Sequence, residues 1–170
     1  RIAERMQRVL DHGQYIMGPE VQELEQQLAA YTGAPHCITV ASGTEALLIA
    51  LMAIGLKPGD EVITTAHSWI STSETITQAG GIPVFVDTDP ITFSIDPARI
   101  EGKITSRTVG IIPVHLYGQA ADMDPIMAIA AKHKRWVIEE CAQAHLATYK
   151  GRKVGRFGQA ATWSFYPGKN

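Results

Sequence analysis

Apolar and polar positions along the chain follow two periods, one typical of helices and one typical of buried strands. In residues 19–31, apolar side chains recur every three or four positions, and Pro19 suits the first turn of a helix. Short runs rich in β-branched residues, such as EVITT at 61–65, are typical of strands. The two kinds of segment alternate along the chain, so the pattern predicts an α/β protein.

The predicted elements can be placed by residue range. Helices are expected at the start of the chain, after the pair Asp96–Pro97, and over residues 19–31, 44–54, 71–79 and 123–132. Strands are expected over residues 36–40, 61–65, 83–87, 108–114, 136–139 and 160–165. Strands separated by helices imply right-handed βαβ units and a mostly parallel sheet that is covered on both faces. We therefore predict a three-layer αβα sandwich, with residues 1–170 in one domain.

Composition narrows the function classes. The 170 residues are 45% apolar and 19% charged with a net charge of −2, which argues against a nucleic-acid or membrane-surface binder. No apolar run approaches the roughly 20 residues of a membrane span, and no signal peptide is visible, so the cytoplasm is the expected location. The two cysteines, Cys37 and Cys141, are not spaced as a metal site, and none is predicted. The chain starts without Met and stops at Asn170, soon after a strand, so we expect it to belong to a longer protein.

Ligands of open α/β sheets bind at the carboxyl ends of the strands, where four segments carry candidate chemistry. Residues 41–44 (ASGT) join a strand to a helix, whose free N–H groups would suit a phosphate, although a plain helix cap is also compatible. Trp69 follows a strand and could stack on a flat ring or simply pack. No dinucleotide or P-loop glycine fingerprint is present.

The other two segments carry charged groups. Glu139 and Glu140 end an apolar strand, where a carboxylate is costly unless it is paired, functional or exposed. Lys169 follows Pro167 and Gly168 in a tight loop, as a nucleophile toward carbonyls or as an ordinary surface lysine. Pyridoxal phosphate (PLP) needs this set of groups: a helix terminus, a stacking surface, an anion and a lysine.

The chain resembles the DegT/DnrJ/EryC1/StrS sugar aminotransferases, which are PLP enzymes of fold type I. The motifs that carry the resemblance span the chain: GQYIMGPEV at 13–21, SGTEAL at 42–47, PGDEVI at 58–63, PVHLYG at 113–118, IEECAQA at 138–144 and SFYPGKN at 164–170. The resemblance implies that Lys169 forms the Schiff base with PLP. It also implies that Gly43, Thr44 and Ser164 bind the cofactor phosphate.

The resemblance implies three further contacts with the cofactor. Trp69 would stack on the pyridine ring, Glu140 would pair with the ring nitrogen, and Gln143 would contact the ring hydroxyl. The family usually has Asp where this chain has Glu140, so the charge is kept on a side chain one methylene longer. A slight shift of the ring or of the strand would let the longer side chain pair with the ring nitrogen.

The implied activity is amino transfer, with glutamate as donor, to a nucleotide-linked keto-sugar. The resemblance further implies a homodimer with shared sites and a smaller C-terminal domain, so residues 1–170 alone are expected to be inactive. A PLP-dependent sugar dehydratase is an alternative, although such relatives carry His where Lys169 stands. A non-catalytic PLP-binding relative is another, and a nicotinamide-dependent oxidoreductase fits the layering but lacks the glycine fingerprint.

Overall fold

The structure, a computed structural model, describes residues 1–169 and divides into two compact units, residues 1–39 and 40–170. The first unit is a pair of helices, α1 (Ile2–His12) and α2 (Pro19–Thr32). Each helix ends where a glycine adopts the left-handed conformation, Gly13 at φ 67° and Gly33 at φ 76°. The expected helices at the start of the chain and over 19–31 are confirmed.

The predicted strand over residues 36–40 is wrong. The segment forms no strand, because the hydrogen-bonding groups of Thr39 bind a side chain rather than a neighbouring strand. The Glu25 carboxylate accepts the Thr39 backbone N–H at 2.7 Å and its hydroxyl at 2.9 Å. An extended run becomes a strand only when another backbone completes its ladder, and among the described residues none pairs with this run.

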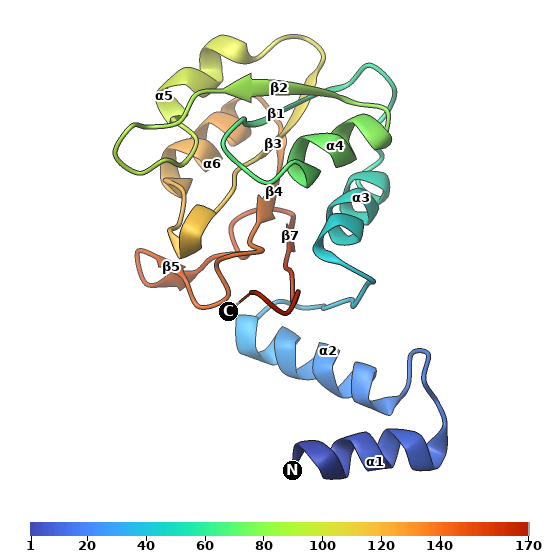
Figure 1. The fold of residues 1–170 in the computed structure, drawn as a ribbon. Coiled ribbons are helices and arrows are strands. Elements are labelled where there is room, and N and C mark those ends of the chain that lie inside the picture. The colour runs from blue at the N-terminus through green and yellow to red at the C-terminus, as the bar shows by residue number, and fades with distance from the viewer. Residues whose placement is uncertain (170) are drawn as a thin grey trace. The chain divides into compact units, whose positions relative to one another are not determined.

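The second unit is built on a parallel sheet with strand order β2-β1-β3-β4-β7 (Figure 1). The strands are β1 (Glu61–Thr65), β2 (Ile82–Val86), β3 (Thr108–Ile112), β4 (Trp136–Glu140) and β7 (Ala160–Thr162). Five of the six expected strands are therefore present. β3 stops before Pro113, which has no N–H for the ladder, so that Val114 keeps only an isolated bridge to Glu140.

Helices cover both faces of this sheet. The helical elements are α3 (Gly43–Ala53), α4 (Ser71–Gln78), α5 (Pro97–Ile100), α6 (Met123–Lys132) and two short 3₁₀ segments, η1 (Glu101–Lys103) and η2 (Leu116–Gly118). Side chains from α3 and α4 pack on one face with Val62, Ile112 and Ile138. Side chains from α5 and α6 pack on the other face with the adjacent strand residues, among them Ile63 and Ile111.

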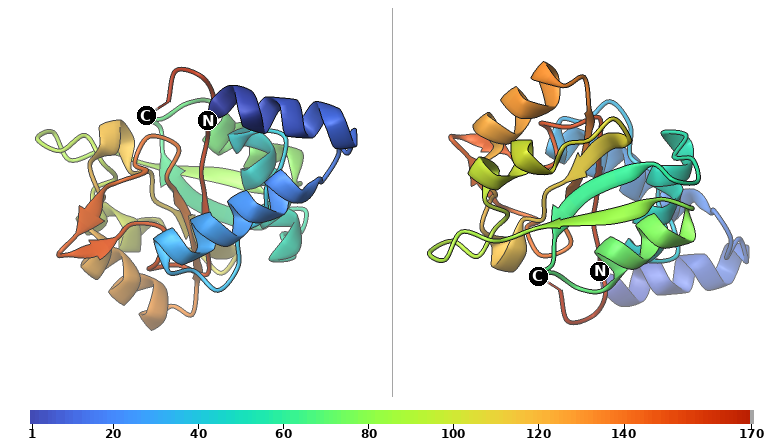
Figure 2. Two further views of the ribbon diagram at one scale, coloured as in Figure 1. Left: turned by 90° about the horizontal axis from the view of Figure 1, so that it is seen from below. Right: turned by 90° about the horizontal axis from the view of Figure 1, so that it is seen from above.

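This alternation of strand side chains between two cores confirms the predicted three-layer αβα arrangement, which Figure 2 shows from two further directions. The sequence did not predict the small antiparallel hairpin of β5 (Thr148–Tyr149) and β6 (Arg152–Lys153). Its two-residue turn, Lys150–Gly151, has positive φ at both positions, as tight hairpins require. No helix among residues 1–169 is long and apolar enough to cross a membrane.

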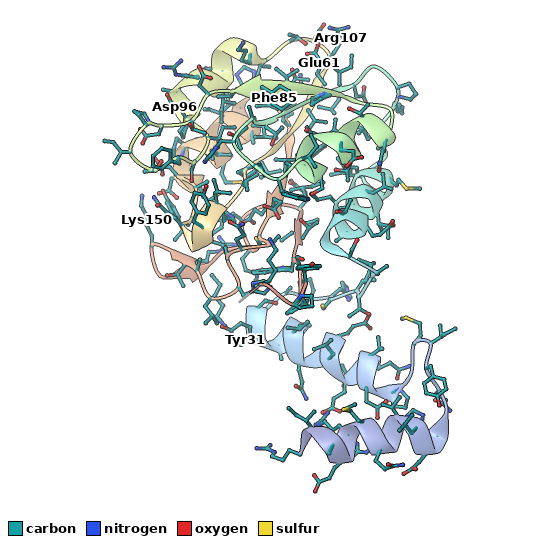
Figure 3. All side chains as sticks on the ribbon, in the orientation of Figure 1. Tyr31, Glu61, Phe85, Asp96, Arg107 and Lys150 are labelled. Atoms are coloured by element: carbon teal, nitrogen blue, oxygen red, sulfur yellow. The ribbon has the colours of Figure 1, made fainter. Side chains whose placement is uncertain are left out.

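A carboxylate, that of Glu61, is buried at the amino end of the sheet. Glu61, at the start of β1, is only 4% exposed. It accepts hydrogen bonds from the hydroxyls of Thr105 and Thr108 and forms an ion pair with Arg107. Figure 3 labels Glu61 and Arg107 at this end of the unit. The hydrogen bond from Thr105, with the other contacts, lowers the pKa of the Glu61 carboxyl despite its burial.

Candidate active site

The opposite, carboxyl end of the sheet holds the predicted site segments. The start of α3 meets the segment that follows β7: a Cβ on Gly43 would lie 2.9 Å from Ser164 Cβ and 3.2 Å from the Trp163 carbonyl oxygen. Only glycine therefore lets the two backbones approach this closely. The structure thus brings together Gly43, Thr44 and Ser164, the three residues expected to bind phosphate.

The first turn of α3 is arranged as an anion site. The Ser42 hydroxyl accepts the Glu45 N–H at 3.1 Å, and the Ser42 carbonyl accepts the Ala46 N–H at 2.9 Å. These bonds leave the N–H groups of Gly43 and Thr44 without an acceptor in the helix. Free N–H groups and the positive end of the helix dipole favour a phosphate at this point, beside the Ser164 hydroxyl.

Glu140 ends β4, and Lys169 lies in the loop that follows β7, the strand paired with β4. Glu140 is 8% exposed, and its Oε1 accepts the Ala142 N–H at 2.9 Å. Burial raises the pKa of the Glu140 carboxyl, while the Lys169 ammonium is near enough to oppose that shift. The Lys169 N–H donates to the Tyr166 carbonyl at 2.7 Å, which fixes the Tyr166–Lys169 turn. The predicted anion and the predicted lysine thus follow two neighbouring strands, and the lysine charge acts on the carboxylate.

Glu139, the neighbour of Glu140, has a different environment. It is fully buried and accepts hydrogen bonds from His115 Nε2 at 3.1 Å and from the backbone N–H groups of Gly155, Phe157 and Gly158 at 2.7–2.8 Å. Burial alone would raise the pKa of Glu139, but these bonds outweigh it and lower the pKa. Glu139 therefore has a structural role, and Glu140 is the carboxylate left for a ligand.

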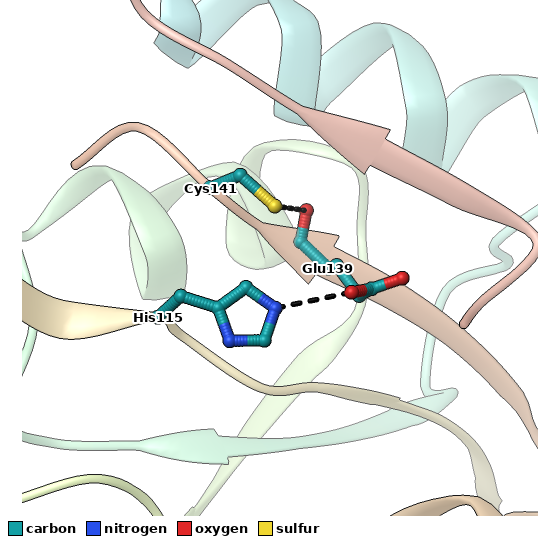
Figure 4. Close-up of side chains that lie close together, drawn as sticks. All are labelled: His115, Glu139 and Cys141. Carbon is teal, nitrogen blue, oxygen red and sulfur yellow. Dashed lines mark hydrogen bonds and ion pairs between the residues drawn. The ribbon is translucent and has the colours of Figure 1, made fainter. Parts of the chain in front are cut away.

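His115 lies beside Glu139 and Cys141 (Figure 4). An imidazole nitrogen, a carboxylate oxygen and the thiol sulfur, the atoms that could bind a metal, lie within 4.8 Å of one another. His115 Nδ1 accepts the Ala121 N–H at 3.0 Å, so the ring proton is on Nε2, where it faces Glu139. Burial raises the pKa of the Cys141 thiol well above its ordinary value. Because both imidazole nitrogens are engaged in hydrogen bonds, His115 and Glu139 form a buried structural network beside Cys141.

Gln143 is oriented by the turn that follows β3. Its Oε1 accepts the Tyr117 backbone N–H at 2.8 Å, so its NH₂ group is the part left for a ligand. The Tyr117 hydroxyl lies 3.4 Å from His67 Nε2, in the segment between β1 and α4. Trp69, in that same segment, is 75% exposed, and its ring contacts no other ring among residues 1–169. The structure places Trp69 at this end of the sheet but does not fix its ring against the other site residues.

Comparison with known proteins identifies the family. Residues 1–170 match the DegT/DnrJ/EryC1/StrS aminotransferase family over their whole length. The chain belongs to this family. The parallel sheet with helices on both faces is thus the fold type I architecture of this family.

Curated members of the family resemble the chain closely. It is 52% identical to a UDP-2-acetamido-2-deoxy-3-oxo-D-glucuronate aminotransferase of Pseudomonas aeruginosa over 169 residues, 99% of this chain and 47% of the relative. It is 51% identical to a pleiotropic regulatory protein of Geobacillus stearothermophilus over 174 residues, 100% of this chain and 47% of the relative. The chain therefore spans about half the length of the curated relatives it matches.

Solved structures confirm the fold. A crystal structure of ntda from Bacillus subtilis with bound cofactor PMP superimposes with a TM-score of 0.94 at 40% identity, over 99% of this chain and 38% of that chain.

The sequence did not predict the buried network of His115, Glu139 and the loop at Gly155–Gly158. The available signal was a histidine at the end of a strand in PVHLYG, but its partners come from segments far apart in the sequence.

Proposed function

We propose that the protein carrying this chain is a PLP-dependent aminotransferase that transfers an amino group from glutamate to a nucleotide-linked keto-sugar. The observation that carries the proposal is the buried Glu140 carboxylate, on which the Lys169 charge acts, with the α3 terminus against Ser164. The P. aeruginosa relative acts on a UDP-linked oxo-sugar, and the ntda structure contains PMP. Both support the proposed cofactor and substrate class.

The residues present fit PLP. The Gly43 and Thr44 N–H groups with the Ser164 hydroxyl suit its phosphate, and a Cβ at Gly43 would obstruct their approach. Burial disfavours the ionised form of Glu140, so its carboxylate suits a cationic ring nitrogen as partner. PLP, when bound, supplies the electron sink that stabilises negative charge on a substrate carbon.

The side chains then have distinct tasks. Lys169 Nζ would hold the cofactor and would accept and return a proton as general base and acid. The Glu140 carboxylate would pair with the positive charge of the ring nitrogen. Gln143 would donate from its NH₂ group to the ring oxygen, and Trp69 would offer a stacking face. We further propose that residues 1–170 are part of the PLP-binding large domain, and that a partner subunit in a homodimer completes the site.

Labelling tests the attachment of the cofactor. The full-length protein is reconstituted with PLP and reduced with borohydride, and the modified peptide is mapped. We expect the label on Lys169, and none in Lys169→Ala. Lys150→Ala is the matched control, because Lys150 is an exposed lysine paired with Asp124 on the β5–β6 hairpin. A label on another lysine would refute the assignment.

Turnover tests the reaction class. The full-length protein is incubated with glutamate and a panel of nucleotide-linked keto-sugars, and 2-oxoglutarate and the sugar product are measured. We expect release of 2-oxoglutarate that depends on the sugar, and a rate at least about 10³-fold lower in Lys169→Ala. A dehydrated sugar would indicate the dehydratase alternative. PLP binding without turnover would indicate a non-catalytic relative, a possibility that the similarity to a regulatory protein keeps open.

A further inference from the structure

Tyr117 adopts a backbone conformation that its residue type disfavours. Its φ of 56° and ψ of 21° lie in the left-handed region, which side chains other than those of Gly and Asn adopt at a cost. Met17, Phe93, Lys134 and Lys150 share a positive φ. Lys134 lies just after a helix and Lys150 in a hairpin turn, where this conformation is common, and Met17 and Phe93 lie in loops. Tyr117 instead follows the central strand β3, at the end of the sheet that holds the site residues.

The turn around Tyr117 is anchored firmly. The His115 N–H donates to the Glu140 carbonyl at 3.0 Å, and His115 Nδ1 accepts the Ala121 N–H at 3.0 Å. Between these anchors the Gln119 N–H donates to the Leu116 carbonyl at 2.9 Å, which closes the turn. A strained residue persists only where its surroundings determine its conformation, and these bonds provide that constraint.

The strained conformation directs one hydrogen bond. It turns the Tyr117 N–H onto Gln143 Oε1, 2.8 Å away. The next residue, Gly118, at φ 81°, passes so close to Gln143 that a Cβ there would lie 3.3 Å from the Gln143 carbonyl oxygen. A side-chain amide can rotate to present either its oxygen or its NH₂ group, and a fixed N–H donor removes that freedom.

We propose that Tyr117 is a positioning residue whose left-handed backbone fixes the Gln143 amide, so that Gln143 presents only its NH₂ group to the cofactor. The part of this inference that concerns the cofactor rests on the proposed function. A donor held toward the ring oxygen favours its anionic form, whereas a freely rotating amide would present its own oxygen part of the time. The Tyr117 phenol, 71% exposed, is not required for this role.

Substitutions at position 117 separate the backbone from the side chain. Asn tolerates the left-handed region and Gly adopts it freely, whereas β-branched Val opposes it. Tyr117→Asn and Tyr117→Gly are therefore expected to keep the PLP dissociation constant and the absorbance spectrum of the parent. Tyr117→Val is expected to weaken PLP binding about tenfold and to shift the spectrum in the same direction as Gln143→Leu. The double variant Tyr117→Val/Gln143→Leu should be no worse than Gln143→Leu alone.

Two controls keep the result interpretable. Tyr117→Phe removes only the hydroxyl that contacts His67 and should match the parent. Thr64→Val removes a comparable buried hydrogen bond, from the Thr64 hydroxyl to the Ile112 carbonyl at 2.9 Å, without touching the turn, and should leave the spectrum unchanged. If Tyr117→Val does not fold, Gly118→Ala strains the same turn and takes its place. Impaired binding in the Asn and Gly variants, or parental binding in the Val variant, would overturn the proposal.

A measurement without cofactor distinguishes this proposal from the proposed function. The Gln143 side-chain NH₂ signal in the NMR spectrum of the cofactor-free full-length protein is assigned by its loss in Gln143→Leu. We expect one slowly exchanging conformer in the parent and in Tyr117→Asn, and averaging in Tyr117→Val. If the protein bound no PLP but showed this pattern, the proposed function would fail and the positioning by Tyr117 would stand. Averaging in the parent would refute the positioning itself.

Discussion

The two ends of the parallel sheet each bury a glutamate, and the two carboxyls respond in opposite directions. Glu61 at the amino end is 4% exposed, and Glu140 at the carboxyl end is 8% exposed. Contacts with Thr105, Arg107 and Thr108 lower the pKa of Glu61. Burial raises the pKa of Glu140, whose carboxylate accepts a single hydrogen bond among residues 1–169, from the Ala142 N–H.

The difference shows how structural and functional carboxylates can be told apart. A carboxylate that the fold has supplied with partners stabilises the protein, whereas one buried with few partners costs stability until a cation arrives. Glu139 repeats the lesson one residue from Glu140, because it accepts four hydrogen bonds within the chain. Burial alone therefore does not identify a site carboxylate. The number of its hydrogen-bond and ion-pair partners within the protein does.

The largest expected effect on turnover follows from removing the Glu140 carboxylate, which has few partners within the protein. Glu140→Ala should lower turnover of the full-length protein by at least about a hundredfold, because the positive ring nitrogen loses its buried partner. Lys169 should still take up the borohydride label, because attachment needs only the lysine and the aldehyde. Glu140→Asp keeps the charge and should be tolerated. Parental turnover in the alanine variant would remove Glu140 from the site.

The stability of the cofactor-free protein should change in the opposite sense. The raised pKa means that folding disfavours the ionised form, so at neutral pH the Glu140 charge costs stability. Glu140→Gln should therefore leave the unfolding midpoint in urea unchanged or raise it. A clear loss of stability would show that Glu140, like Glu61, is a structural residue. The proposed difference between the two ends of the sheet would then be wrong.

Glu139→Gln is expected to destabilise the fold by about 3 kcal/mol, because one acceptor oxygen becomes a donor that faces either the Phe157 and Gly158 N–H groups or the Gly155 N–H and His115. The lowered pKa gives the sign of the pH dependence. The stabilisation is complete above the unfolded pKa of roughly 4.3 and is lost as the pH falls through the folded value. Urea unfolding of the parent should therefore show this loss in acid, and the Gln variant should show less of it. Equal stability at neutral pH would contradict the assignment.

Much of this architecture could be predicted from the sequence, for local reasons. The runs at 61–65 and 123–132 match β1 and α6 in full, because hydrophobic period and turn residues are both local signals. The strand at 36–40 could not be excluded, because strand formation depends on a partner elsewhere in the chain. The segment after β7 likewise leaves the sheet at Thr162, three residues before the predicted end.

The candidate site could be predicted in part from family motifs. They named Glu140, Gln143 and Lys169, but the structural role of Glu139 could not be predicted, because its hydrogen-bond partners lie far away in the sequence. The orientation of Gln143 depends on the left-handed backbone conformation of Tyr117, which a tyrosine in the sequence does not predict. The roles in cofactor binding stay predictions, and the last two experiments address them.

Removing the phosphate donors should have a moderate effect. Ser164→Ala or Thr44→Ala is expected to weaken PLP binding about tenfold, because each removes a side-chain hydroxyl that can donate to the charged phosphate, while the Thr44 backbone N–H is kept. Ser94→Ala is the matched control: the Ser94 hydroxyl is buried without a partner and lies in the loop before α5. The dissociation constants can be measured by fluorescence titration. Unchanged affinity in both site variants would refute the phosphate assignment.

The smallest expected effect concerns Trp69, the most exposed of the predicted site residues at 75%. Stacking on a flat ring is worth about 1 kcal/mol, so Trp69→Ala should weaken PLP binding roughly fivefold. It should also remove most of the quenching of tryptophan fluorescence that PLP binding causes. The other two tryptophans are packed in place, Trp136 over Gly110 and Trp163 over Gly155. Trp136→Phe and Trp163→Phe should therefore retain the quenching, and quenching that persisted in Trp69→Ala would show that the ring faces one of those two instead.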